Sequence, residues 1–100
     1  MTSRTWDHTE VCRVLALAGD PAALGGAVSV ALCGHWEHAG PCRWEHHTSS
    51  EADGDGAVVT VSFDASAEDE QQVRDLIRSA LAAGSLVGPD GTATTWQLAP

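Results

Sequence analysis

The chain has 100 residues, of which 43% are hydrophobic and 19% charged, the balance of one folded domain rather than of a disordered chain. Asp and Glu number 14 against 5 Lys and Arg, and the formal net charge is −9. A chain this acidic repels phosphate backbones and anionic lipid headgroups, so we expect neither a nucleic-acid nor a membrane partner.

The first residues and the cysteine count predict where the protein acts. Residues 1–8 are polar and lack the basic-then-apolar layout of a signal peptide, and no apolar run approaches the ~20 residues that span a bilayer. Three cysteines are an odd number, which argues against a framework of disulfides alone and suits a reducing compartment. We expect a single small cytoplasmic domain over residues 1–100, with residues 1–8 as a loosely ordered N-terminal arm.

Two strands are predicted in the first part of the chain. Residues 11–18 form an apolar run that ends at a Gly-Asp-Pro turn signal, which predicts a buried strand. A helix over residues 9–18 is the alternative, because Thr9 followed by Glu10 resembles an N-cap with an acidic first turn. Residues 27–38 alternate between apolar and mixed positions with a period of two, which predicts a second strand.

Three more strands are predicted further along the chain. Residues 42–49 follow a Gly-Pro break and predict a strand that returns antiparallel to the one before it. Residues 51–56 are acidic and rich in glycine, which indicates a hairpin turn. Residues 58–63 and residues 92–98 then alternate with a period of two and predict two further strands.

A long amphipathic helix is predicted over about residues 66–83. Ser66 is a suitable N-cap, and the acidic residues that follow it complement the helix dipole. Glu70 and Arg74 have the spacing of an ion pair on one helix face, and Gly84 is in the position of a C-terminal stop. The apolar stripe consists of Val73, Leu76, Ile77, Ala80 and Leu81.

Together these elements predict the α+β class. We expect a mostly antiparallel sheet of four to five strands, with the order β-β-β-β-α-β and the one long helix packed on one face. If residues 9–18 are helical, the order begins with a helix instead.

The segment from Cys33 to His47 reads CGHWEHAGPCRWEHH and is the part of the chain richest in reactive side chains. If the chain bends about Gly40, positions whose numbers sum to 80 lie opposite one another. This register pairs two tryptophans and, next to them, a glutamate with an arginine, and both pairs are favourable. It also puts Cys33 and Cys42 on opposite faces, which disfavours a disulfide between them.

One face of this predicted hairpin gathers Cys33, His35 and His47, with Glu45 or water as a fourth ligand. Opposed Cβ atoms lie about 5 Å apart, and zinc bonds are about 2.0–2.3 Å long, so these side chains can converge on one ion. A mixed sulfur and nitrogen set suits Zn, Cu or Ni. We therefore predict a small non-catalytic metal-binding module. An alternative ligand set at the hairpin tip consists of His38, Cys42 and His46.

The alternative function is a protein-interaction or accessory domain with no metal and no enzymatic activity. Such a domain would pair with a second copy or with another protein through its sheet. An enzyme is the less favoured interpretation. A cysteine beside a histidine can act as a nucleophile, but the spacing shows no oxyanion loop and no glycine-rich phosphate loop, and we predict no catalytic residue.

Overall fold

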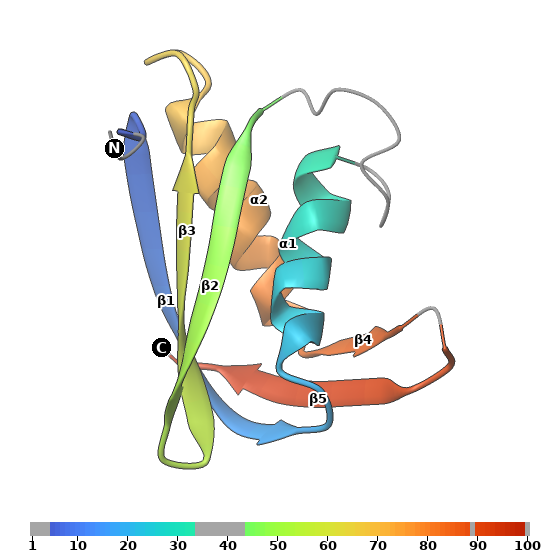
Figure 1. Cartoon of the computed structure of the whole chain (residues 1–100). Coiled ribbons are helices and arrows are strands. Elements are labelled where there is room, and N and C mark those ends of the chain that lie inside the picture. Colours follow the sequence, from blue (N-terminus) through green and yellow to red (C-terminus); the bar gives the residue numbers. More distant parts are fainter. Residues whose placement is uncertain (1–4, 34–43, 89, 100) are drawn as a thin grey trace, which may run out of the picture.

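The computed structural model describes residues 5–33, 44–88 and 90–99. In these ranges the chain forms five strands and two helices (Figure 1). In chain order the elements are β1 (His8–Ala18), α1 (Ala22–Cys33), β2 (His46–Asp53), β3 (Gly56–Phe63), α2 (Glu70–Ala82), β4 (Ser85–Val87) and β5 (Ala93–Leu98).

The strands form one antiparallel sheet in the order β2-β3-β1-β5-β4. Because β3 runs antiparallel to both β1 and β2, these two strands run parallel to each other, and α1 is the crossover between them. α2 lies in the second crossover, from β3 to β5, with β1 between those two strands. In the β1-α1-β2 unit the two strands are separated by β3, and in the β3-α2-β5 unit they are separated by β1. Both helices cover the same side of the sheet (Figure 1).

Most of the predicted architecture is confirmed. The protein belongs to the α+β class with a mostly antiparallel sheet, and residues 11–18 lie in a strand rather than in the alternative helix. The turn within residues 51–56 and the strands predicted over 58–63 and 92–98 are present to within two residues. The strand β1 begins at His8, so this residue belongs to the sheet and not to the expected arm; residues 1–4 lie outside the described residues.

The strand predicted over residues 27–38 is wrong, because residues 22–33 form α1. The order is therefore β-α-β-β-α-β-β, and the return strand begins at His46 instead of residue 42. The sequence of α1, AALGGAVSVALC, has no polar face, so its apolar residues fit a period of two as well as one of 3.6. The parallel course of β1 and β2 requires a long crossover, and this tertiary requirement favours the helix.

α2 agrees with the helix predicted over 66–83, although regular helix begins only at Glu70. The Ser66 Oγ accepts the backbone N–H of Asp69 at 3.3 Å, so Ser66 caps the turn that leads into the helix. Gly84 follows the helix with a φ of +77°, a conformation that suits glycine and ends the helix. The fully buried positions of α2 are Val73, Ile77 and Leu81.

The core lies between the sheet and the two helices. Every second residue of β3 is buried, and so are the inner faces of both helices. Trp44 and Trp96 belong to this core and are 6% and 4% exposed. Trp96 Nε1 donates to the backbone oxygen of Leu81 at 2.7 Å, and Trp44 Nε1 donates to the Asp69 carboxylate at 3.3 Å. The two indole rings therefore tie α2 and its N-terminal turn to the rest of the molecule. Trp36 lies outside the described residues.

Candidate functional site

Cys33, the last residue of α1, is disulfide-bonded. Its sulfur lies 4.0 Å from Nδ1 of His46, at the start of β2. His46 also contacts the Ser29 hydroxyl of α1 through Nε2, at 3.4 Å. The end of α1 and the start of β2 are therefore linked through a sulfur, an imidazole and a hydroxyl. Because metals bind the thiolate form of cysteine, Cys33 is available as a ligand only after reduction.

His47 lies on the other side of the sheet from Cys33. Consecutive residues of a strand point to opposite faces, and His46 points toward α1, so His47 points away from the helices beside Ser62 of β3. The structure therefore brings Cys33 together with His46 and separates it from His47. Three of the predicted ligands lie outside the described residues: His35, His38 and Cys42.

The predicted strand that placed Cys33 opposite His47 is wrong, because Cys33 is the last residue of the helix α1. The argument against a disulfide between Cys33 and Cys42 depended on that strand; Cys33 is disulfide-bonded, and Cys42 lies outside the described residues. Glu45 precedes β2, and its backbone oxygen accepts the N–H of Asp64 at 3.0 Å. Among the described residues, no three His, Cys, Asp or Glu side chains are grouped as a metal site requires. The predicted metal site as a whole stays a prediction.

A buried carboxylate, that of Glu10 in β1, joins the sheet to α2. Glu10 is 6% exposed, and its two oxygens lie 2.5 Å from Nη1 of Arg74 and 2.7 Å from Nε of Arg78. Arg74 also donates to Glu70 at 2.9 Å and to the backbone oxygen of Thr9 at 3.0 Å. The predicted pair of Glu70 with Arg74 is thus confirmed as one part of a larger network. The two guanidinium groups explain how a carboxylate is tolerated beneath α2.

Two further titratable groups border this network. His8 Nδ1 lies 3.5 Å from the Glu70 carboxylate, and its ring lies 5.1 Å from that of Phe63. The Cys12 sulfur lies 3.9 Å from Glu10, and burial, followed by the negative charge of Glu10, raises the pKa of the Cys12 thiol. A thiol with a raised pKa stays protonated at neutral pH and is a poor nucleophile. The network therefore attaches α2 to β1 and does not supply an activated nucleophile.

The other face of the sheet is covered by neither helix. On β1, β2 and β3 the residues of this face are exposed or half-buried, in contrast to the buried residues that alternate with them on β1 and β3. Val11, near the middle of β1, is 56% exposed. Nine residues of this side form three cross-strand rows, and we call them the open face. The rows are His47, Ser62 and Thr9; Ser49, Thr60 and Val11; and Glu51, Val58 and Arg13.

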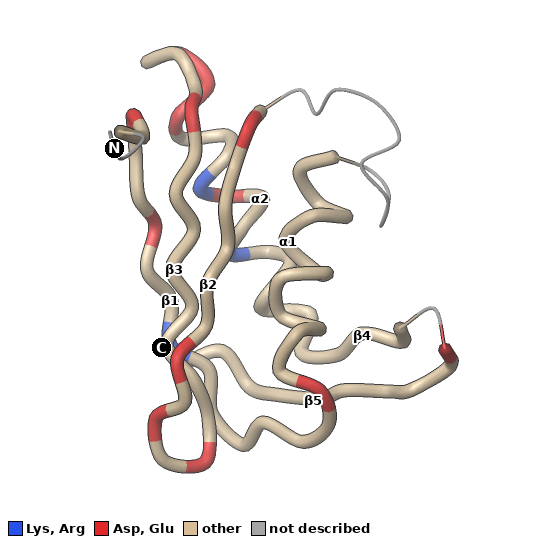
Figure 2. Tube along the Cα trace, viewed as in Figure 1, with Lys and Arg blue, Asp and Glu red and all other residues tan. Residues whose placement is uncertain are grey.

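The open face carries little net charge, although the whole chain carries −9. Arg13 is paired with Asp53, with 2.5 Å between Nη2 and the carboxylate oxygen. Glu51 is the acidic member of the nine and lies on β2, the edge strand. Acidic residues are concentrated instead in the connections and around the start of α2 (Figure 2). The middle of the open face, around Val11 and Thr60, is therefore neutral.

The open face is not predicted from the sequence, because residues 11–18 are interpreted as a strand buried on both sides. A usable signal begins two residues before that run, at Thr9, and continues into it. From Thr9 to Arg13 every second residue is polar or exposed, and Val11 falls on the same side as these polar residues. The alternation of β3 gives the matching signal, since Thr60 and Ser62 fall on one side of that strand.

Comparisons with protein-family models, with curated proteins and with solved structures found no match. Neither helix of the described chain has the length and hydropathy of a membrane span. What the protein does is therefore inferred from its own geometry.

Proposed function

We propose that this protein is a non-catalytic interaction domain that pairs with a second copy of itself through the open face. The observation that carries the proposal is Val11, a valine 56% exposed in the neutral middle of a sheet face that neither helix covers. Copies of a protein with a charge of −9 repel each other least where the surface carries no net charge. Pairing face to face covers Val11 and leaves the acidic connections in water (Figure 2).

The size of the face fits a weak and reversible dimer. Strands lie about 4.8 Å apart and rise about 3.3 Å per residue, so the three strands of the open face, over five residues each, present roughly 240 Å². Two such faces together bury roughly 500 Å², less than the ~1,000 Å² of a stable specific interface, so we expect the dimer to dissociate readily. A two-fold dimer uses the same patch on both copies, so one substitution changes the interface twice.

Sedimentation velocity from micromolar to millimolar protein tests the proposal with a matched pair of variants. Val11→Glu places two carboxylates in the interface and should keep the protein monomeric at every concentration. Val87→Glu makes the same change at the other large exposed hydrophobic of the described residues, on the same side of the sheet but on the far edge strand β4, outside the nine residues of the open face. It should associate like the wild type. A wild type that is monomeric throughout, or equal loss of association in both variants, would contradict the proposal.

Metal binding is a second candidate, supported by the 4.0 Å separation between the Cys33 sulfur and Nδ1 of His46. His46 Nδ1 also lies 3.2 Å from the Trp44 backbone oxygen, so this contact has to open as well as the disulfide. Once Cys33 is reduced and Nδ1 is released, a thiolate and an imidazole so placed can approach one Zn, Cu or Ni ion. Elemental analysis of protein purified with and without a reductant tests this candidate. About one equivalent of metal, lost in His46→Ala and kept in His47→Ala, would support it. No metal in either preparation would contradict it.

A further inference from the structure

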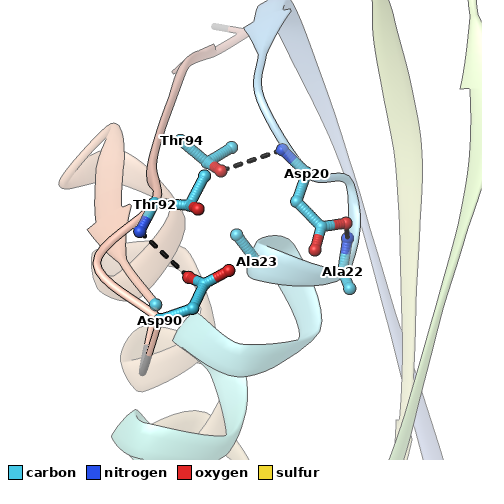
Figure 3. Close-up of a pocket in the computed structure, with 7 residues that line it drawn as sticks. Asp20, Ala22, Ala23, Asp90, Thr92 and Thr94 are labelled. Carbon is cyan, nitrogen blue, oxygen red and sulfur yellow. Dashed lines mark hydrogen bonds between the residues drawn. The ribbon is translucent and has the colours of Figure 1, made fainter.

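A cavity of about 310 Å³ lies between the β1–α1 connection and the β4–β5 hairpin (Figure 3). Asp20, Ala22 and Ala23 line it on one side, and Asp90, Thr92 and Thr94 on the other. The two sides are joined by a hydrogen bond from the Asp20 N–H to Oγ1 of Thr94 at 3.0 Å. Gly19 permits this close approach, since it has a φ of +119° and a Cβ there would lie 2.5 Å from the same oxygen.

Two carboxylates face this cavity from opposite sides (Figure 3). Each uses one oxygen in its own turn: Asp20 accepts the N–H of Ala22 at 3.0 Å, and Asp90 accepts the N–H of Thr92 at 2.9 Å. The backbone N–H of Thr92, followed by the Thr92 hydroxyl, lowers the pKa of Asp90 by hydrogen bonding, so this carboxylate is ionised at neutral pH. The second oxygen of each carboxylate is directed into the cavity (Figure 3).

The cavity also contains a buried hydroxyl, that of Thr94, which is 1% exposed. Its oxygen accepts the Asp20 N–H, and its own O–H donates to no group of the described chain. A buried hydroxyl with an unused donor generally faces a water molecule or a ligand. The amides of Ala23 and Leu24, by contrast, already donate to backbone oxygens, so this helix end offers them to no anion. Among the residues that the structure describes, no Lys or Arg lines the cavity.

We propose that this cavity binds a small organic cation, with one ammonium or guanidinium group on a short apolar body. The charge would lie between Asp20 and Asp90, and the body would rest on the methyl groups of Ala22 and Ala23. A volume of about 310 Å³ is at the lower end for small-molecule sites, which suits a body of about four carbons. This site is independent of the open face and of self-association. Because both carboxylates are accessible to water, we expect affinity in the millimolar range.

Titration of isotope-labelled protein with butylammonium, followed by the amide NMR signals of Ala22, Ala23 and Thr92, tests the proposal. Saturable shifts are expected with butylammonium, and only weak shifts with butanol or butyrate at the same concentrations. Asp20→Asn and Asp90→Asn keep an oxygen acceptor for their turns but remove the charge, and each should weaken binding about fivefold. Asp55→Asn, the same change in the β2–β3 turn, should leave binding unchanged and serves as the control.

Each contrary outcome overturns the proposal. Equal shifts with butanol would show an apolar cleft without charge recognition, and affinities unchanged in both Asn variants would show binding elsewhere. The remaining alternative is a site for a metal ion, which a titration with calcium chloride alone tests. Saturable shifts at lower concentrations than butylammonium requires would indicate a metal site instead. Well-dispersed spectra of the unliganded variants confirm that a loss of binding is not a loss of fold.

Discussion

α1 and α2 pack on the same side of one sheet and are similar in length, 12 and 13 residues, yet they are attached by different forces. α1 carries no charged residue and is held by apolar side chains such as Leu24 and Val28, both 0% exposed. α2 adds ionic contacts, because Arg74 and Arg78 reach across to Glu10 of β1. Attachment of α1 should therefore depend on the volume that its side chains fill, and attachment of α2 also on salt and pH.

The largest effect is expected on the apolar side of this comparison. Leu24→Ala removes a fully buried side chain of α1 and should lower the free energy of unfolding by about 3 kcal/mol, through lost burial and the cavity left behind. Denaturant unfolding measures this loss, which should be the same in dilute and in molar sodium chloride. A loss below about 1 kcal/mol would mean that α1 packs loosely on the sheet.

A somewhat smaller effect is expected on the ionic side. Glu10→Gln leaves Arg74 and Arg78 facing an uncharged group and should cost about 2 kcal/mol, less than a fully buried pair because Arg78 is largely exposed. The cost should shrink in molar salt, unlike that of Leu24→Ala. Glu68→Gln, the same change at an exposed position before α2, serves as the control and should stay within about 0.5 kcal/mol. A salt-independent cost at Glu10 would remove the distinction between the two helices.

A gain in stability is expected within α1. Gly25→Ala should raise the free energy of unfolding by about 0.5–1 kcal/mol, because alanine favours helix and its new Cβ would lie 3.8 Å from Thr48, an ordinary contact. Gly19→Ala is the matched contrast and should destabilise the protein, since a Cβ there clashes with Thr94. The midpoint of denaturant unfolding reports both changes. Destabilisation by Gly25→Ala would show that α1 lies closer to β2 than its contacts indicate.

The titration of the Cys12 thiol, beneath α2, is expected to change the free energy of unfolding least of all at neutral pH. Burial and the nearby Glu10 raise the pKa of this thiol above its ordinary value of 9.0, so the fold favours the protonated form. The stability that this preference contributes is complete below pH 9 and is lost as pH rises through the raised pKa. The free energy of unfolding should therefore fall in alkaline solution, and less steeply in Cys12→Ala. Identical alkaline profiles for the two proteins would contradict this assignment.

The two helices also show how far sequence patterns reach. α2 can be predicted from its own segment of sequence, since its apolar stripe, capping serine and terminal glycine all lie there. α1 has no polar residue opposite its apolar ones, so nothing within residues 22–33 distinguishes helix from strand. The distinction comes from β3, which separates β1 from β2 and obliges the chain to cross over.

The sites were less predictable than the fold, for the same reason. The hairpin that would have joined Cys33 to His47 was inferred from local pairing, and the misassigned helix moved Cys33 to the side of His46. The cavity at Asp20 and Asp90 joins the predicted Gly-Asp-Pro turn to the β4–β5 hairpin. The two turns lie together because residues about seventy positions apart in the chain pair in the sheet. No local sequence pattern contains this pairing.

The split arrangement of the strands has a consequence for how the protein is made. β1 is complete when residue 18 has been synthesised, but both of its neighbours, β3 and β5, come after residue 55. At a synthesis rate of about 5–20 residues per second, an extended apolar strand waits roughly two to nine seconds for β3. A nascent chain that stalls before residue 56 holds β1 and β2 without β3, the strand with which both of them pair in the folded protein.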